Sequence, residues 1–258
     1  MDRIKIAFFD IDGTLIDMNT KHITARTVDA LRRLRARGVK VCIATGRSPM
    51  TLPDFGGAEF DAFLTFNGSL CYAGEETIFS APIPHADVLR LVDNATALGR
   101  PVAVATRDTI AANGTDKDLT DYFAIANEEP PLTADFNAVC AREVYQLMLG
   151  CRAADYPALL HGVDGAKMAA WWDRAADIIP ARGGKGIGIE KVLAWYGFTR
   201  EEAMAFGDGN NDIEMLQAVG HGVAMANASP DLKAVASAVC PAVSEDGMAR
   251  YCEEQGLI

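Results

Sequence analysis

The stretch that decides the fold is IKIAFFDIDGT, residues 4–14. Residues 4–9 form a nearly continuous apolar run, as expected of a strand that is buried on both faces of a sheet. The run ends at Asp10, and Asp12 follows two residues later. Gly13 lets the backbone turn away at once, so that both carboxylates face the same space. The segment therefore predicts a buried strand that delivers two acids at its C-terminal end, where ligands bind in open α/β sheets.

Strands and helices alternate around this segment. Residues 24–36 have the spacing of an amphipathic helix that Gly38 ends, and apolar strands are expected at 39–44 and 62–66. The same rhythm returns after Lys185. The elements expected there are helices over 188–196, 212–219 and 230–236 and strands over 203–207 and 222–225. This βαβ rhythm predicts an α/β fold, a doubly wound, Rossmann-like parallel sheet covered by helices on both faces.

The regular alternation of strands and helices is interrupted between residues 82 and 180. The elements expected there are a helix over 87–98 and strands over 102–106, 144–149, 168–172 and 175–179. Asp173 and Arg174 form a hairpin turn in this interpretation. We therefore expect a catalytic core made of residues 1–81 and 181–258, interrupted by an inserted, mostly antiparallel α+β domain at 82–180.

A second acidic cluster, AFGDGNND, occupies residues 205–212 and also follows an apolar strand. Two carboxylates at one strand end repel each other unless a positive charge lies between them. Mg²⁺ suits this position because it is satisfied by a few carboxylates together with substrate phosphate. Asp208 can complete a three-carboxylate metal site, Asn211 can bond a phosphate oxygen or a ligating acid, and Asp212 can cap the helix that follows. The alternative is a capped helix start with turn glycines.

Two weaker signals lie between the acidic clusters. ATGR at 44–47 ends the second strand and offers a hydroxyl, loop amides and a guanidinium to an anion, and GGKG at 183–186 precedes the next helix with an ammonium. Each is also compatible with an ordinary turn. A P-loop is excluded because Gly186 follows Lys185 where Ser or Thr is required. The residues 207–212 do not form a dinucleotide-binding loop, because Asp208 and Asp212 would lie where a pyrophosphate should bind.

Four short motifs now resemble those of the haloacid dehalogenase superfamily. They are Asp10-x-Asp12-Gly13-Thr14, Thr45, Lys185 and Gly207-Asp208-Gly209-x-Asn211-Asp212, in this order. The insert, with FNG at 66–68 before it and GVAMANA at 222–228 after the fourth motif, is similar to the Cof-type subfamily. That group of sugar-phosphate phosphatases carries a large cap of the type called C2B at the position of the insert.

The resemblance implies a role for each motif residue. Asp10 would be the nucleophile that forms an aspartyl-phosphate, and Asp12 the general acid and base. Mg²⁺ would be held by Asp10, the backbone carbonyl of Asp12, and Asp208, while Asp212 either binds the ion or supports a ligand from behind. Lys185 and Thr45 would contact the transferring phosphoryl group. The residues expected to line the phosphate are Gly46, Arg47, Asn67, Gly68 and Asn211.

The expected function is that of a Mg²⁺-dependent phosphatase acting on a small phosphorylated metabolite, with the insert as a lid. A phosphomannomutase-like phosphoryl transferase and a non-catalytic phospholigand sensor remain alternatives. A sensor should have lost Asp10, Asp12 or Lys185, and all three are present. Trp171 and Trp172 are adjacent in an expected strand, so that one of them packs in the core and the other can face a sugar.

The composition limits the partners. The chain has 258 residues and a net charge of −11, which disfavours nucleic acid and anionic membranes as general partners. No apolar run approaches the roughly 18 residues of a membrane span, and the N-terminus does not have the pattern of a signal peptide. The six cysteines form no CxxC pair and are expected to be reduced in a cytoplasmic protein. No heptad stands out, so we expect a monomer.

Overall fold

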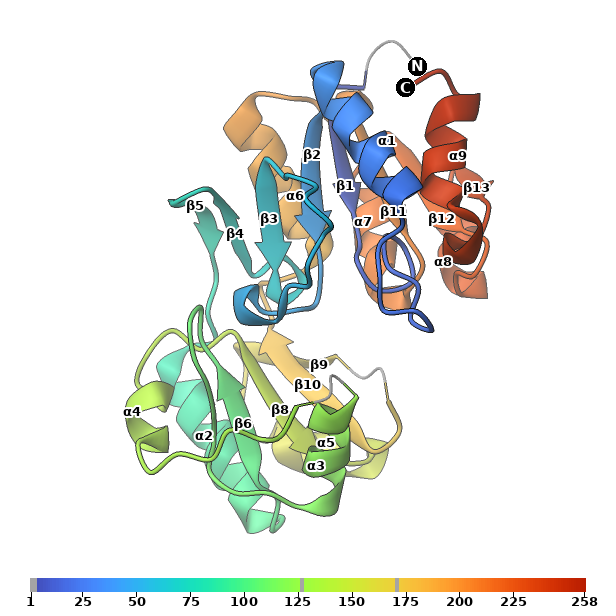
Figure 1. Ribbon diagram of the computed structural model, residues 1–258. Helices are drawn as coiled ribbons and strands as arrows, with labels where there is room; N and C mark the ends of the chain where they lie inside the picture. Colours follow the sequence, from blue (N-terminus) through green and yellow to red (C-terminus); the bar gives the residue numbers. More distant parts are fainter. Residues whose placement is uncertain (1–3, 126–127, 170–171) are drawn as a thin grey trace. The chain divides into compact units, whose positions relative to one another are not determined.

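The computed structural model describes residues 4–125, 128–169 and 172–258, and the chain forms two compact units (Figure 1). The first unit consists of Met1–Arg47, Leu52–Ser80 and Gly184–Ile258. The second consists of Ser48–Thr51 and Ala81–Gly183.

An eight-stranded sheet forms the centre of the first unit, in the order β13-β12-β11-β1-β2-β3-β4-β5. Its strands are β1 (Ile6–Phe9), β2 (Lys40–Ala44), β3 (Ala62–Thr65), β4 (Leu70–Ala73), β5 (Glu76–Ser80), β11 (Ala203–Gly207), β12 (His221–Met225) and β13 (Ala238–Cys240). The six strands from β13 to β3 are parallel, with β1 between β11 and β2. This confirms the predicted doubly wound α/β sheet.

The hairpin of β4 and β5 adds two antiparallel strands to one edge of the sheet, which the sequence did not predict. The reason is burial. An edge strand has one side open to solvent, and β5 has no fully buried residue. Its sequence ETIFS therefore lacks the apolar run by which buried strands are recognised.

Alternating side chains on β1 divide the core of the first unit into two layers. Phe9 packs with α1 (Ala25–Ala36) and α9 (Gly247–Glu254) on one face of the sheet. Phe8 packs with α6 (Lys185–Tyr196), α7 (Ile213–Gln217) and α8 (Pro230–Val235) on the other face. Both rings are fully buried, and burial of each contributes about 1.5–3 kcal/mol. Strict alternation along a short strand is thus what lets helices cover both faces.

The ends of α1 agree with the sequence, whereas two helices near the predicted site differ from it. Thr24 caps α1 by accepting a hydrogen bond from the Thr27 N–H, and the helix ends before Gly38, as predicted. The helix expected to begin at residue 188 begins instead at Lys185, because Gly186 and Gly188 are tolerated in its tightly packed first turn. The helix expected over 212–219 is shorter and follows a 3-10 turn at Asn210–Asp212.

The second unit contains a five-stranded antiparallel sheet in the order β7-β6-β8-β10-β9. The strands are β6 (Val102–Ala105), β7 (Ile110–Ala112), β8 (Gln146–Gly150), β9 (Ala166–Ala169) and β10 (Ala175–Pro180), and the helices are α2 (His85–Ala97), α3 (Lys117–Ala124), α4 (Phe136–Cys140) and α5 (Tyr156–Leu159). Helices α2, α4 and α5 share one apolar core with the sheet, which includes Ala176 and Ile178. Asp177 lies between these two residues, and it accepts a hydrogen bond from the Tyr122 hydroxyl of α3 at 2.8 Å. We infer that α3 covers the opposite face of the sheet.

The antiparallel pairing of β9 with β10 agrees with the predicted hairpin. The expected strand over 168–172 is wrong at its end, because Trp172 lies in a bend. In the described residues, β9 covers Ala166–Ala169. The Arg174 guanidinium lies 4.3 Å from the centroid of the Trp172 ring. Trp171 lies outside the described residues.

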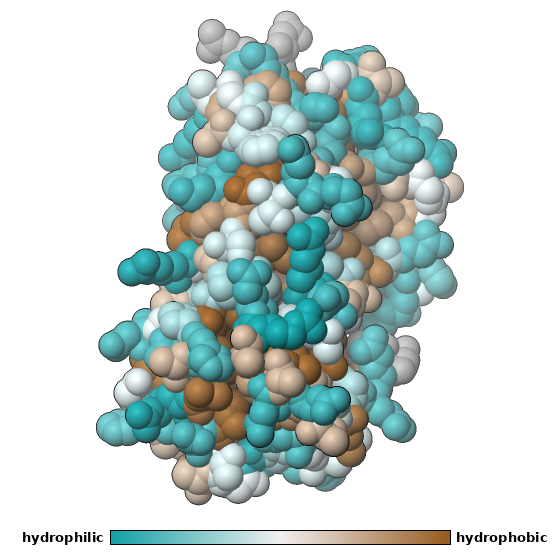
Figure 2. All heavy atoms as spheres, turned by 90° about the vertical axis from the view of Figure 1, so that its left-hand side faces the viewer, coloured by the Kyte–Doolittle hydropathy of each residue, from teal (hydrophilic) through white to brown (hydrophobic). Residues whose placement is uncertain are grey.

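Membrane spans and disulfides are both predicted to be absent. None of the helices in the described ranges combines the length and the apolar character that crossing a membrane requires. All six cysteines belong to the described ranges, and they are free and buried, as expected of structural thiols. On the face drawn in Figure 2, hydrophilic side chains cover much of the surface, with smaller groups of apolar side chains among them.

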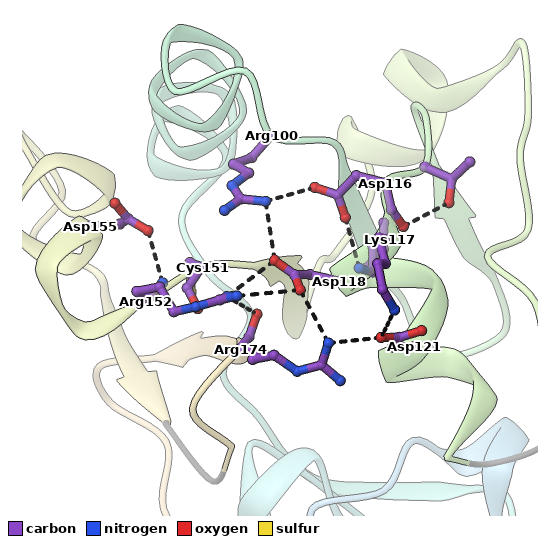
Figure 3. Close-up of polar contacts among 11 residues, drawn as sticks. Arg100, Asp116, Lys117, Asp118, Asp121, Cys151, Arg152, Asp155 and Arg174 are labelled. Carbon is purple, nitrogen blue, oxygen red and sulfur yellow. Dashed lines mark hydrogen bonds and ion pairs between the residues drawn. The ribbon is translucent and has the colours of Figure 1, made fainter.

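A network of ion pairs anchors α3 within the second unit (Figure 3). Asp118, whose side chain is 12% exposed, is approached by Arg100 at 3.3 Å, Arg152 at 3.1 Å and Arg174 at 3.6 Å. Arg174 also pairs with Asp121 at 2.8 Å. The hydrogen bond from Arg152 is the main cause that lowers the pKa of Asp118. Asp118 therefore ties α3 to three separate segments of the same unit.

Replacing Asp118 by Asn should lower the free energy of unfolding of the second unit by about 1–2 kcal/mol, because charge-assisted hydrogen bonds are lost. Since the pKa of Asp118 is lowered by folding, its contribution is complete near neutral pH and is lost as the pH falls below about 4. Thermal unfolding at pH 7 and at pH 3.5 measures both effects. Asp108→Asn is the control. The one ion pair that the structure describes for Asp108 is with exposed Arg142, so its loss should lower the free energy of unfolding by less. Equal melting temperatures for the Asp118 and Asp108 variants at pH 7 would contradict this role.

Candidate active site

The predicted site residues all lie in the first unit, at the C-terminal edge of its sheet. Asp10 follows β1, Thr45 follows β2, and Asp208 follows β11. Because these strands are parallel neighbours, their C-terminal ends meet at one edge. Lys185 reaches this edge as the first residue of α6.

Lys185 forms the centre of the site. Its fully buried ammonium donates hydrogen bonds to Asp10 Oδ1 at 2.6 Å and to Asp212 Oδ1 at 2.5 Å. Burial alone would lower the pKa of Lys185, but the charges of Asp10 and Asp212 outweigh it and raise that pKa above the usual range. The ammonium is therefore permanently charged and holds two carboxylates from distant parts of the chain.

The position of Lys185 depends on a close approach between backbones. Phe66, Asn67 and Gly68 form a turn after β3 in which all three residues have positive φ, and Gly68 has φ +80°. A Cβ atom at Gly68 would lie 2.5 Å from the carbonyl oxygen of Gly184. Only glycine permits both this conformation and this contact, so the turn after β3 can pack against the start of α6.

Three carboxylates from this edge can hold a cation. Asp10, Asp208 and Asp212 each offer an oxygen, and these oxygens lie within 4.8 Å of one another. Burial is the main cause that raises the pKa of Asp208 to about 6, and it also raises the pKa of Asp10. When ionised, the three acids exceed the single charge of Lys185 by two. An all-oxygen ligand set with this excess charge fits a hard divalent cation such as Mg²⁺.

Asp212 has a different local role from the one predicted. It was expected to cap the helix after it, but its side chain makes no capping bond to α7. Asp212 Oδ2 instead accepts the N–H groups of Asp208 and Gly209 at 2.9 and 3.0 Å. The 3-10 turn at Asn210–Asp212 aims the carboxylate back at the loop, so that Asp212 fixes the segment that carries Asp208.

Asp12 forms a separate pair with Arg47. Arg47 donates from Nε to Asp12 Oδ2 at 2.8 Å and from Nη2 to Asp12 Oδ1 at 2.7 Å, a bidentate arrangement. Of the carboxylates that the structure describes, that of Asp12 is not a member of the three-acid group. The binding of a cation by the Asp12 backbone carbonyl, and of phosphate by Arg47, stay predictions.

The remaining predicted residues connect the loops along this edge. Thr45 Oγ1 accepts from the Arg47 N–H at 3.1 Å, and the Asn67 N–H donates to the Thr45 carbonyl at 2.9 Å. Asn211 Nδ2 donates to Asn67 Oδ1 at 3.2 Å. A Cβ atom at Gly46 would lie 3.3 Å from the Asn67 amide. The fold therefore brings these residues together. Their contact with phosphate stays a prediction.

Two further residues touch the site, although the sequence motifs that contain them predicted no individual role for either. Thr14 Oγ1 donates to Asp208 Oδ1 at 3.0 Å, and Asn227 Nδ2 lies 3.3 Å from Asp208 Oδ2. Thr14 belongs to the first motif, and Asn227 follows the end of β12. One feature of the sequence could have indicated Asn227, because it is a polar residue just beyond the C-terminal end of a parallel strand.

Replacing Lys185 by Met should destabilise the first unit by about 3–5 kcal/mol, because buried carboxylates lose their counter-charge. Without the ammonium, the folded-state pKa of Asp10, which burial already raises, should lie further above its unfolded value. The variant should therefore become more stable as the pH falls from 8 to 6, since the folded protein then binds more protons. Thermal unfolding across this range tests the prediction, with Lys191→Met, an exposed position on the same helix, as the control. Equal stability of the two variants at pH 8 would exclude the buried-charge account.

Comparisons with known proteins agree with this geometry. A sequence profile described as haloacid dehalogenase-like hydrolase matches residues 7–251. YkrA of Bacillus subtilis is 33% identical over 256 residues, which cover 98% of each chain. The 5-amino-6-(5-phospho-D-ribitylamino)uracil phosphatase YitU of the same organism is 29% identical over 260 residues, with 95% of each chain covered.

A solved structure leads to the same family. The sugar phosphatase BT4131, of HAD subclass IIB, is 30% identical, covers 98% of this chain and 100% of its own, and superposes with a TM-score of 0.87. These matches extend over almost the whole chain, so they include both units. They confirm the resemblance drawn from the four motifs, including its Cof-type character. The chain therefore belongs to the haloacid dehalogenase-like hydrolases.

Proposed function

We propose that this protein is a Mg²⁺-dependent phosphatase that hydrolyses monoesters of small phosphorylated metabolites. The observation that carries the proposal is the group of three carboxylates around the buried ammonium of Lys185, with Asp12 two residues from Asp10. A carboxylate can attack a phosphate dianion only where positive charge offsets the repulsion between them. Lys185 supplies one such charge, and Mg²⁺, when bound by Asp10 and Asp208, would supply the rest.

In the first half of the proposed reaction, Asp10 is the nucleophile. Its Oδ1 is held by Lys185 at 2.6 Å, which leaves Oδ2 to attack phosphorus. The new bond joins Oδ2 to phosphorus, the bond from phosphorus to the ester oxygen breaks, and the leaving alkoxide takes a proton from Asp12. The products are an aspartyl-phosphate on Asp10 and a free alcohol.

In the second half, Asp12 acts as the base. It removes a proton from a water molecule, whose oxygen attacks the same phosphorus, and the bond to Asp10 breaks to release inorganic phosphate. Arg47 holds both oxygens of Asp12 in the structure. We therefore propose that Arg47 orients Asp12 between proton transfers, in addition to any contact it makes with phosphate.

We assign the role of a cap domain to the second unit, whose side chains would then select the organic part of the substrate. One relative is named for a ribitylaminouracil phosphate and another for sugar phosphates. Both names describe a phosphate ester on a polyhydroxylated carbon chain. We propose that substrates of this class are the first to test.

Asp10→Asn should reduce phosphate release below detection, because the amide is not a nucleophile, whereas Asp12→Ala should slow it by about 10²–10⁴-fold. Free phosphate is measured with p-nitrophenyl phosphate and a panel of sugar phosphates, and Asp29→Asn on the exposed face of α1 is the control. Normal turnover by a purified, folded Asp10→Asn protein would contradict the covalent mechanism. A wild-type protein that moves phosphate between positions of a sugar bisphosphate without releasing it would instead be a mutase.

Removal of divalent cations should abolish turnover reversibly. With EDTA present, Asp10 and Asp208 lose the charge that offsets their repulsion for the substrate, so phosphate release should stop. Addition of excess Mg²⁺ should restore it. Steady-state assays with and without EDTA measure this, and full activity in EDTA would rule out a metal-dependent reaction.

A further inference from the structure

Asn227 joins three segments of the first unit through one side chain. It lies in the turn between β12 and α8. Its Nδ2 donates to the carbonyl oxygen of Gly13 at 2.8 Å and to Asp208 Oδ2 at 3.3 Å. Its Oδ1 accepts the N–H of Val243 at 3.0 Å. The amide therefore uses both its donor and its acceptor end, and one of its partners is a carboxylate of the three-acid group.

The carboxylate of Asp208 is held from several sides. Thr14 donates to Oδ1, and Asn227 donates to Oδ2. The same carboxylate packs directly on Gly13, where a Cβ atom would lie 2.1 Å from Asp208 Oδ2. Each carboxylate oxygen has two lone pairs, so both oxygens keep the capacity to bind a cation. These contacts fix the rotation of the Asp208 carboxylate and leave lone pairs on its oxygens available to a cation.

The hydrogen bond to the Gly13 carbonyl acts on a second part of the site. Gly13 has φ +86° and follows Asp12. It therefore belongs to the turn that carries Asp10 and Asp12, and the hydrogen bond helps to fix the orientation of its peptide. Asn227 thus contacts the backbone of the first motif and the side chain of the fourth. Its anchor at Val243 lies in the 3-10 turn Val243–Glu245, which precedes α9.

We propose that Asn227 is a positioning residue for the cation site. It holds the Asp208 carboxylate in the orientation that meets Asp10 and Asp212. The proposal rests on the cation-binding part of the proposed function, but not on hydrolysis of any particular ester. An amide is required, because aspartate would offer no donor and would place a like charge beside Asp208. Serine would be too short to span Gly13, Asp208 and Val243 together.

Asn227 is itself exposed, so replacing it should leave the fold intact. The matched control is Ser229→Ala in the same turn. Ser229 caps α8 by accepting from the Leu232 N–H and bonds Asn210. Its contact with Asp208 is made by its backbone N–H, which alanine keeps. Loss of the cap should lower the melting temperature without altering the cation site.

The experiment measures Mg²⁺ binding directly, by isothermal titration of the full chain in the absence of substrate. For Asn227→Ala we expect the dissociation constant of Mg²⁺ to rise about 10-fold, the effect of losing an outer partner of a metal ligand. The melting temperature without metal should stay close to that of the wild type. The Mg²⁺ concentration for half-maximal hydrolysis of p-nitrophenyl phosphate should rise in parallel, with the maximal rate largely recovered at saturating Mg²⁺.

A second variant tests the anchor. Val243→Pro removes the N–H that Asn227 accepts and also replaces a side chain that packs at the margin of the core. The chain tolerates proline there because Ala242 has φ −66° and ψ 159°. It should weaken Mg²⁺ binding in the same direction but by less. Unchanged Mg²⁺ affinity in this variant would overturn the anchoring step of the proposal.

The outcomes separate this inference from the proposed function. Wild-type Mg²⁺ affinity in Asn227→Ala, an equal loss in Ser229→Ala, or no Mg²⁺ binding by the wild type would each overturn the positioning role. If the wild type binds Mg²⁺, Asn227→Ala binds it more weakly, and neither releases phosphate from any ester, the positioning role stands and the phosphatase proposal fails.

Discussion

The rest of the site depends on one buried ammonium. Removing charges from water costs several kcal/mol for each ion unless partners compensate, and Lys185 is fully enclosed with Asp10 at 2.6 Å and Asp212 at 2.5 Å. Without it, both carboxylates would lose the counter-charge that they share. Asp208 adds a third carboxylate to this group, so the group carries more negative than positive charge. The architecture of the first unit meets this constraint by joining the ends of β1 and β11 to the start of α6.

This local balance explains how an acidic protein can act on an anion. The net charge of −11 would repel a phosphate ester at long range, but screening limits that effect to about 10 Å in 0.1 M salt. Within the site, the fixed charge of Lys185 and the bound divalent cation of the proposed mechanism decide the interaction. Asp10, Asp208 and Asp212 contribute to the overall acidity, and in the proposed mechanism they create a place for positive charge.

The sequence predicted those features that depend on local pattern and chain order. The apolar run before Asp10 and the helix that begins after Thr24 are examples, and the strand over 203–207 has the predicted bounds. It did not predict the β4–β5 hairpin, because β5 is a solvent-facing edge strand without a distinctive apolar run. It placed the start of α6 too late, because glycine is unfavourable in a free helix and is accepted here through packing against Gly68.

Side-chain partners at the site were the least predictable. The pairing of Arg47 with Asp12 was not predicted, and Asp212 accepts backbone N–H groups before it rather than after it. Asn227 received no role at all. Each of these contacts depends on which loops the fold brings together, and a single sequence carries little information on such pairings.

The central claim is that Asp10, held by Lys185, is the nucleophile. The most direct measurement is to quench the protein with acid during turnover of p-nitrophenyl phosphate, reduce it with borohydride, and map the modified residue by mass spectrometry. An aspartyl-phosphate at position 10 would be reduced to homoserine, so we expect this change in the peptide that contains residues 4–14. Steady phosphate release with Asp10 unmodified, or with the modification at another residue, would contradict it.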